Sequence, residues 1–215
     1  MYFKDRQEAG IRLSSLFQER KYKGFIVLAL PRGGVPVGFE IARQLNAPLE
    51  VLVARKIAIP QQPEYGLGAI SELNTIIFDK ERIAKEKISK KKLKDIVKKE
   101  KYELKRRINL YRKNKKINIK NKKVIIVDDG LATGVTARAA SLAAKKMGAR
   151  KIIFAAPVCA TESMLELAKH VEEAICLLNE KHLGSIGRYY QNFEQISDEE
   201  VIAILRKTTQ PAFLK

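Results

Sequence analysis

The fold of this chain is decided by the stretch Val124-Ile125-Ile126-Val127-Asp128-Asp129-Gly130-Leu131-Ala132-Thr133-Gly134-Val135-Thr136. Its first four residues are apolar without alternation, which predicts a strand buried on both faces, as in a parallel sheet. Two carboxylates end the strand, and a turn of small residues then opens an alanine-rich helix, 137–147, that stops at Gly148. A helix N-terminus exposes backbone N–H groups and favours negative charge, so this turn predicts an anion site.

The side chains of this stretch match the two ends of a ribose 5-phosphate. Asp128 and Asp129 can accept hydrogen bonds from a vicinal diol such as the ribose hydroxyls. Thr133 and Thr136 add hydroxyl donors, and Gly134 permits a close approach of the backbone to a phosphate. A Walker phosphate loop is excluded because no Gly-Lys-Ser/Thr follows, and the triple-glycine spacing of a dinucleotide-binding fold is missing.

Strands without polar alternation are interleaved with helices along the chain, and this predicts an α/β fold with a mostly parallel sheet flanked by helices. Ligands of such folds bind at the carboxyl ends of strands, so the loops after Leu30, Ala54 and Val127 are the first candidates. With no internal repeat and no linker, residues 1–215 are expected to form a single domain. The expected strands are 25–30, 49–54, 76–78, 124–127, 152–158 and 174–178, and besides the 137–147 helix, three helices are expected to begin at capping pairs (Asp5/Glu8, Ser163/Glu166, Ser197/Glu200) and a fourth at Pro36, ending near Leu45.

Two basic stretches follow the earlier strands. The first, Arg32-Gly33-Gly34, offers a charged donor and exposed backbone N–H groups, a combination suited to a pyrophosphate. The second, Arg55-Lys56, leads into the segment 57–68, whose prolines and glycines predict a loop. An ordinary surface loop with two basic residues is the alternative for this second stretch.

Together these motifs resemble the type I phosphoribosyltransferases between Phe25 and Leu178. The resemblance implies binding of phosphoribosyl pyrophosphate, transfer of its ribose 5-phosphate to a nitrogen acceptor, and release of pyrophosphate. The expected acceptor is a nucleobase. It implies Mg²⁺ as cofactor, held by the substrate and not directly by protein ligands, and a cis peptide at the pair Arg32-Gly33. One departure is Gly130, where the family usually has an apolar residue. The implied roles are ribose hydroxyl binding by Asp128 and Asp129, 5-phosphate binding by Ala132, Thr133, Gly134, Val135 and Thr136, and pyrophosphate binding by Arg32, Gly33, Gly34, Arg55 and Lys56; catalysis falls to Asp128, Asp129, Arg32 and Lys56.

The resemblance also implies that the C-terminal segment 179–215 consists of a hood over the acceptor, between His182 and Phe193, and a C-terminal helix. Tyr189, Tyr190 and Phe193 are candidates to stack on a flat base, and packing against the sheet edge is an equally good interpretation. The whole pattern also resembles a subgroup of uncharacterised phosphoribosyltransferases. A regulator that binds phosphoribosyl pyrophosphate without turnover is the alternative function, and it could contact nucleic acid through a basic helix.

The net charge of +18 belongs almost entirely to one segment. Residues 80–123 contain 21 Lys or Arg and 5 Asp or Glu, while the rest of the chain is nearly balanced. Apolar residues at helical spacing (Leu93, Ile96, Val97, Leu104, Ile108 and Tyr111) predict a basic helical insertion packed on the core. A nucleic-acid surface is the less favoured alternative, because few aromatics accompany the bases.

The remaining composition points to a soluble protein of the cytoplasm. No apolar run approaches the roughly 20 residues needed to cross a bilayer, so no membrane contact is expected. The N-terminus does not read as a signal peptide. Cys159 and Cys176 lack metal-ligand spacing and are expected to be buried thiols instead of a disulfide. A homodimer is left open.

Overall fold

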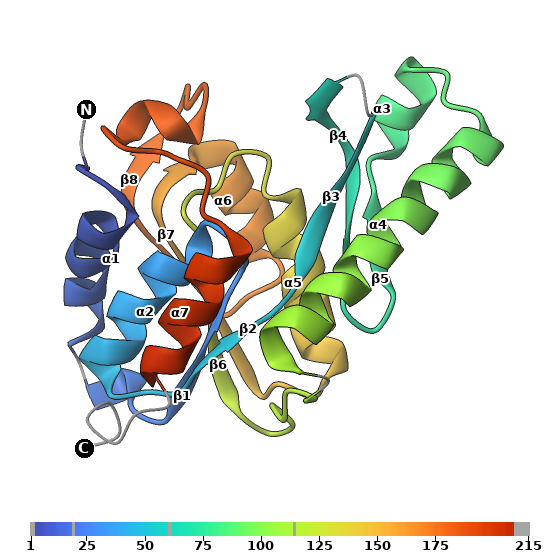
Figure 1. The fold of residues 1–215 in the computed structure, drawn as a ribbon. Helices are drawn as coiled ribbons and strands as arrows, with labels where there is room; N and C mark the ends of the chain where they lie inside the picture. The colour runs from blue at the N-terminus through green and yellow to red at the C-terminus, as the bar shows by residue number, and fades with distance from the viewer. Residues whose placement is uncertain (1–2, 19, 60–61, 114, 209–215) are drawn as a thin grey trace.

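A computed structural model describes residues 3–18, 20–59, 62–113 and 115–208. Its centre is a five-stranded sheet in the order β2-β1-β6-β7-β8, in which every pair of neighbours is parallel (Figure 1). The strands are apolar on both faces because helices cover both sides. The strands of this sheet are β1 (Phe25–Ala29), β2 (Leu49–Val51), β6 (Lys123–Val127), β7 (Lys151–Ala160) and β8 (Glu173–Glu180).

Helices lie on both faces of the sheet, which confirms the predicted α/β architecture (Figure 1). One core contains Val27 and Ile125 of the sheet, packed against residues of α1, α2 and α7. The other contains Leu28 and Ile126, packed against α5 and α6. These elements are α1 (Arg6–Ser14), α2 (Gly34–Leu45), α5 (Val135–Lys146), α6 (Thr161–Ala168) and α7 (Asp198–Thr208), with short turns η1 (Ser15–Phe17), η2 (Arg20–Tyr22) and η3 (Ile186–Tyr189).

Two of the three predicted capping pairs form. The Asp5 carboxylate accepts a hydrogen bond from the Glu8 amide at 2.9 Å. Ser197 and Glu200 accept from each other's backbone N–H groups, which is a complete capping box. The prediction of a capping pair at Ser163 was wrong. Helix α6 already begins at Thr161, and the Ser163 hydroxyl donates to the Ala132 carbonyl.

A second, antiparallel sheet of β3, β4 and β5 lies beside the main one. Two expectations were wrong here: the strand 49–54 is divided between β2 and β3, and much of the expected loop 57–68 is a β-hairpin. The glycines that suggested a loop instead pair in the hairpin, Gly68 with Ile57 and Gly66 with Ala58, at irregularities in the register. Pro60 lies outside the described residues. The strands are β3 (Ala54–Ile59), β4 (Gln62–Ser71) and β5 (Thr75–Phe78), the last as predicted.

The basic segment forms two helices, α3 (Lys80–Lys85) and α4 (Lys90–Arg112), which flank the small sheet in Figure 1. The predicted apolar face of α4 packs on the core: Ile96, Leu104 and Tyr111 are buried, and the other three are partly buried against them. The prediction of helix as far as residue 123 was wrong, because α4 ends where Lys113 takes a left-handed conformation (φ 47°).

The two cysteines are joined as a disulfide between β7 and β8, so the expectation of unpaired thiols was wrong. They are 17 residues apart in sequence, and the parallel pairing of the two strands brings their Cα atoms to 6.4 Å. Their proximity is therefore a product of strand pairing, which their sequence spacing does not reveal. Among the described residues, the helices are too short or too polar to span a bilayer.

Candidate active site

Two loops meet at the carboxyl edge of the main sheet, because β1 and β6 are neighbours. Ala29 and Val127 are partners in the parallel register, and the next amide, of Leu30, donates to the Val127 carbonyl at 2.8 Å. The loop carrying Arg32 therefore begins directly beside the loop carrying Asp128. The structure thus brings together the two motifs that were recognised separately in the sequence.

The loop after β6 lines a cavity of about 390 Å³. Gly134 has a left-handed conformation (φ 68°) and stands directly before α5, so the turn leads into the helix N-terminus. Thr133 is exposed, and Thr136 is half-buried in the first turn of α5. The cavity is lined by the whole run from Asp128 to Gly134, by Thr136 and Ala137, by Lys56, and by Gly184, Ser185 and Ile186.

The paired carboxylates differ in their partners. Asp129 forms an ion pair with Arg6 of α1, whose Nε lies 2.7 Å from Oδ2, and both side chains are largely buried. Asp128 accepts the backbone N–H of Asp129 at 2.9 Å. Burial and the neighbouring charge of Asp129 raise the pKa of Asp128 above its ordinary value. Arg6 is thus the counter-ion of Asp129, the second of the two adjacent acids.

Gly33 and Gly34 allow the two loops to approach each other. A Cβ on Gly33 would lie 1.9 Å from Oδ2 of Asp129, and a Cβ on Gly34 would lie 2.5 Å from the Val127 carbonyl oxygen. No side chain fits at either position without a shift of its neighbours. The cis peptide lies one bond earlier than expected, between Pro31 and Arg32.

Gly130, the one departure from the family motif, is explained by the C-terminal segment. A Cβ on Gly130 would lie 2.7 Å from Cγ2 of Ile186, and Ile186 also lines the cavity. Ile186 belongs to η3, 56 positions later in the chain, and it occupies the space that a side chain at position 130 would need. The space beside Gly130 is therefore filled by the side chain of Ile186 from the C-terminal segment.

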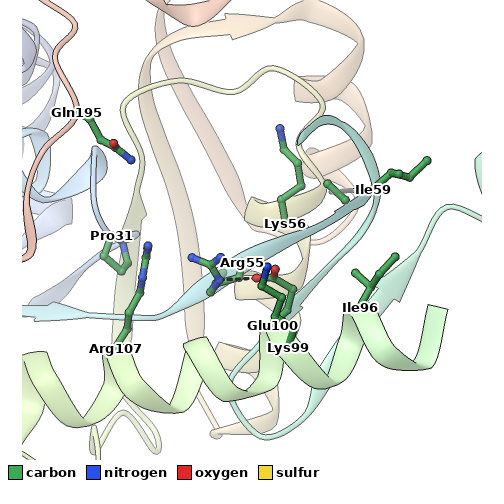
Figure 2. Close-up of a pocket in the computed structure, with 11 residues that line it drawn as sticks. Pro31, Arg55, Lys56, Ile59, Ile96, Lys99, Glu100, Arg107 and Gln195 are labelled. Carbon is green, nitrogen blue, oxygen red and sulfur yellow. Dashed lines mark hydrogen bonds and ion pairs between the residues drawn. The ribbon is translucent and has the colours of Figure 1, made fainter. Parts of the chain in front are cut away.

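Arg55 and Lys56 come from β3, not from a loop. Lys56 lines the 390 Å³ cavity and also a second cavity of about 510 Å³, so it stands where the two adjoin. Arg55 lies in the second cavity, and its Nε is 2.6 Å from Oε2 of Glu100 in α4 (Figure 2). The other walls are Pro31, Ala54, Ala58 and Ile59, Gln195, and Ile96, Lys99 and Arg107 of α4.

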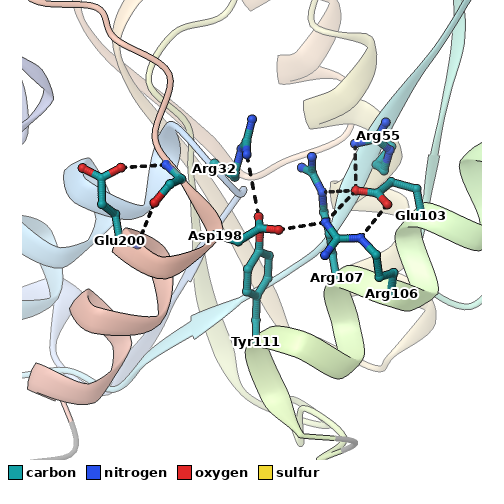
Figure 3. Close-up of polar contacts among 9 residues, drawn as sticks. Arg32, Arg55, Glu103, Arg106, Arg107, Tyr111, Asp198 and Glu200 are labelled. Carbon is teal, nitrogen blue, oxygen red and sulfur yellow. Dashed lines mark hydrogen bonds and ion pairs between the residues drawn. The ribbon is translucent and has the colours of Figure 1, made fainter.

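Arg32 points to a charged network that joins α4 to α7 (Figure 3). Its Nη1 lies 3.8 Å from Oδ1 of Asp198, the first residue of α7. The same carboxylate accepts from Arg106 of α4 at 2.8 Å and from the Tyr111 hydroxyl. Burial alone would raise the pKa of Asp198, but the hydrogen bonds from Tyr111 and Arg106 outweigh it and lower that pKa.

Glu103 is the second centre of this network. It accepts from Arg106 at 2.7 Å and from Arg107 at 2.9 Å, and Arg55 lies 3.9 Å away. The hydrogen bond from Arg106 is the main reason that the pKa of Glu103 falls to about 2. One carboxylate therefore fixes guanidinium groups that would otherwise repel each other at the edge of the larger cavity.

The three hood aromatics pack inside the protein. Tyr189 and Tyr190 are buried with Phe3 and Val158, and Phe193 packs against the same cluster. The Tyr190 hydroxyl donates to the Asp129 carbonyl at 2.7 Å. The hood residues that line the described cavity are Gly184, Ser185 and Ile186 instead.

Arg6 was not among the predicted site residues, although it touches the centre of the site. Besides its ion pair with Asp129, it donates to the Glu194 carbonyl at 2.8 Å, and its guanidinium lies 3.9 Å from the centre of the Phe193 ring. It therefore links α1, the acidic pair and the hood. Arg107 and Asp198 were missed as well, because nothing local in the sequence marks which charge of a basic helix or an acidic helix start faces a cavity.

The family follows from a match over most of the chain. The family model for the phosphoribosyl transferase domain matches residues 7–185. The chain belongs to the phosphoribosyltransferase family. The matched range begins just after Arg6 and ends at the hood residue Ser185, so it includes both loops and both cavities apart from Ile186 and Gln195. The predicted family is thereby confirmed.

Two curated proteins of Mycobacterium tuberculosis, from strains CDC 1551 and H37Rv, resemble this chain at 38% identity over 204 residues. Both carry phosphoribosyl transferase as a provisional name. The alignment covers 94% of this chain and 46% of each relative, so the chain spans about half the length of these proteins.

Solved structures agree with the fold. The protein TT1426 of Thermus thermophilus is similar at a TM-score of 0.77 and 32% identity, over 96% of this chain and 99% of that chain. AQ2163 of Aquifex aeolicus has a TM-score of 0.52 at 13% identity, over 81% and 74% of the two chains, and shares the fold alone.

Proposed function

We propose that the protein transfers the ribose 5-phosphate of phosphoribosyl pyrophosphate to a nitrogen acceptor and releases pyrophosphate. The observation that carries this proposal is the pair of adjoining cavities. One is lined by two strand-end carboxylates and by the turn that opens α5, and Lys56 is a wall both of it and of the cationic second cavity. The family match supports the same chemistry.

In the proposed complex the backbone amides and hydroxyls of Ala132 to Thr136 bind the 5-phosphate at the start of α5. Asp128 and Asp129 accept hydrogen bonds from the ribose hydroxyls. Positive charge develops on the ribose ring as the bond to pyrophosphate breaks, and the two carboxylates stabilise it. Arg32 and Lys56, with Gly33, Gly34 and Arg55 nearby, stabilise the charge that develops on the leaving pyrophosphate.

Mg²⁺ belongs to this proposal as a cofactor carried by the substrate. The donor set fits that role: Asp128 and Asp129 lie side by side at the cavity, and Arg6 already neutralises Asp129. When bound, the ion would offset the charge of the pyrophosphate and hold it beside the ribose hydroxyls. Because its pKa is raised, the ionised form of Asp128 would be stabilised by a nearby cation.

The acceptor remains the open part of the proposal, and a nucleobase is the expected class. Because Tyr189 and Tyr190 are buried, the surface available to a flat acceptor near the ribose comes from Gly184, Ser185 and Ile186. We also propose a cytoplasmic location. Nucleic acid is not favoured as a partner.

The test is a screen for pyrophosphate release. The full chain is incubated with phosphoribosyl pyrophosphate, Mg²⁺ and a panel of nucleobases and small amines, and released pyrophosphate is measured. Acceptor-dependent release supports the transferase, and the variant D128N/D129N serves as the inactive control. Tight binding of phosphoribosyl pyrophosphate without release for any acceptor would favour the alternative, a regulator. Absence of binding would overturn both.

A further inference from the structure

The larger cavity is built jointly by the predicted pyrophosphate loop and by the basic helix α4. Pro31 stands on one side of it, and Lys99, Glu100 and Arg107 of α4 stand on the other (Figure 2). Arg107 extends from the helix toward Pro31 in this view. The role of the basic segment, which the sequence leaves open, is therefore tied to one side chain that reaches the site.

The charges that line this cavity favour an anion. Four cationic side chains and one carboxylate are among its lining residues: Arg55, Lys56, Lys99 and Arg107, against Glu100. Glu100 is engaged with Arg55, whereas the carboxylate partner of Arg107 is Glu103, at 2.9 Å. A cationic wall beside a partly enclosed space raises the local concentration of anions.

The direction in which the substrate must extend leads into this cavity. With the 5-phosphate on the turn 132–136 and the ribose hydroxyls on Asp128 and Asp129, the substrate occupies the 390 Å³ cavity. Lys56 is a wall of both cavities, so a diphosphate bound to Lys56 has its outer phosphate at the entrance of the 510 Å³ cavity. Arg107 of α4 is another wall of that cavity.

We propose that Arg107 of α4 binds the outer phosphate of the pyrophosphate group, so that the basic helix completes the leaving-group side of the site. This rests on the proposed function, because it takes phosphoribosyl pyrophosphate as the ligand. A guanidinium suits the role, since its donors match two phosphate oxygens at once. Glu103 holds Arg107 on the cavity side, and the phosphate shares that guanidinium when it arrives.

The test uses two ligands that differ by the pyrophosphate group. Calorimetry measures the binding of ribose 5-phosphate and of phosphoribosyl pyrophosphate with Mg²⁺ to the full chain, to R107Q and to the control K105Q. Lys105 is exposed on the same helix and loses the same charge, but it does not line the cavity. R107K measures how much of the effect requires the two-pronged guanidinium.

We expect R107Q to weaken phosphoribosyl pyrophosphate by about tenfold or more, as for the loss of a charge-assisted hydrogen bond. Ribose 5-phosphate should bind R107Q and the unchanged protein alike, which also shows that the variant is folded. K105Q should match the unchanged protein for both ligands. Equal affinities of R107Q and the unchanged protein for phosphoribosyl pyrophosphate, or equal losses for both ligands, would overturn the role of Arg107. Failure of the unchanged protein to bind either ligand would instead overturn the proposed function.

Discussion

The two halves of the candidate site are built in different ways. The proposed ribose 5-phosphate half comes mainly from one continuous run, 128–136, in which two acids and a helix start follow a strand. The proposed pyrophosphate half gathers Arg32, Lys56, Arg107 and Asp198 from four segments spread over most of the chain. The first half uses backbone amides and short side chains, while the second uses long side chains held by ion pairs.

This difference bears on how each half responds to substitution. A contiguous turn is held by the strand and helix on either side, so its geometry depends on local backbone. The cationic half depends on carboxylates such as Glu103 and Asp198 that keep like charges in place. We therefore expect substitutions in the first half to act strongly and locally, and those in the second to act more weakly and over a distance.

The largest effect is expected from D128N/D129N. Two charge-assisted hydrogen bonds to the ribose are weakened, at about 1.5–3 kcal/mol each, so affinity for phosphoribosyl pyrophosphate should fall at least a hundredfold. Turnover should fall further, because the same charges stabilise the transition state more than the ground state. Calorimetry beside single-turnover rates measures both. Unchanged affinity and rate would mean that these acids are not the ribose ligands.

The neighbouring glycines separate folding from binding. In G34A the new Cβ meets backbone, the Val127 carbonyl oxygen at 2.5 Å, so stability should fall by about 1–3 kcal/mol. In G33A the Cβ meets the Asp129 side chain at 1.9 Å, which can turn away. G33A should therefore lose less stability and more affinity. Urea unfolding and ligand binding of both variants test this, and the reverse order would contradict the proposed packing.

The two acids should affect stability with opposite signs. D128N removes a carboxylate with a raised pKa and should stabilise the protein. Because ionisation of a group with a raised pKa costs stability above its ordinary pKa, the gain should grow as the pH rises above 3.8. D129N weakens the ion pair with Arg6 and should destabilise the protein. Thermal unfolding of both single variants across pH measures these changes in stability. Changes of the same sign in both variants would contradict the prediction.

The smallest effect is expected from the acid titration of Glu103. Its pKa is lowered from 4.5 to about 2, so the ionised form stabilises the fold above 4.5, and this contribution is lost as the pH falls toward 2. E103Q should remove that part of the acid dependence. The exposed carboxylate of Glu81, in α3, offers the matched control E81Q. Unfolding midpoints measured from neutral pH downward should diverge between E103Q and the unchanged protein, with E81Q following the latter.

Local pattern determined the parts of the site that are contiguous. The run from Val124 to Thr136 specifies its own strand, turn and helix, because apolar periodicity, small residues and helix-start chemistry act over a few positions. The same is true of the loop at Arg32 and of the apolar face of α4. The family and the mostly parallel sheet could therefore be predicted from the sequence, whereas the contact between the two loops came from the pairing of β1 with β6.

Tertiary structure alone decided which distant residues share a surface. The hairpin at 57–68, the Cys159–Cys176 disulfide and the contact of Ile186 over Gly130 depend on strand pairing and packing between segments. Arg6 and Arg107 resemble many other charged residues of this basic chain until the fold places them beside Asp129 and Pro31. The chemistry of a side chain is set by its residue type, but its partners are set by the path of the whole chain. For that reason only the tertiary structure distinguishes Arg107, which lines the larger cavity, from neighbours on α4 such as Lys105.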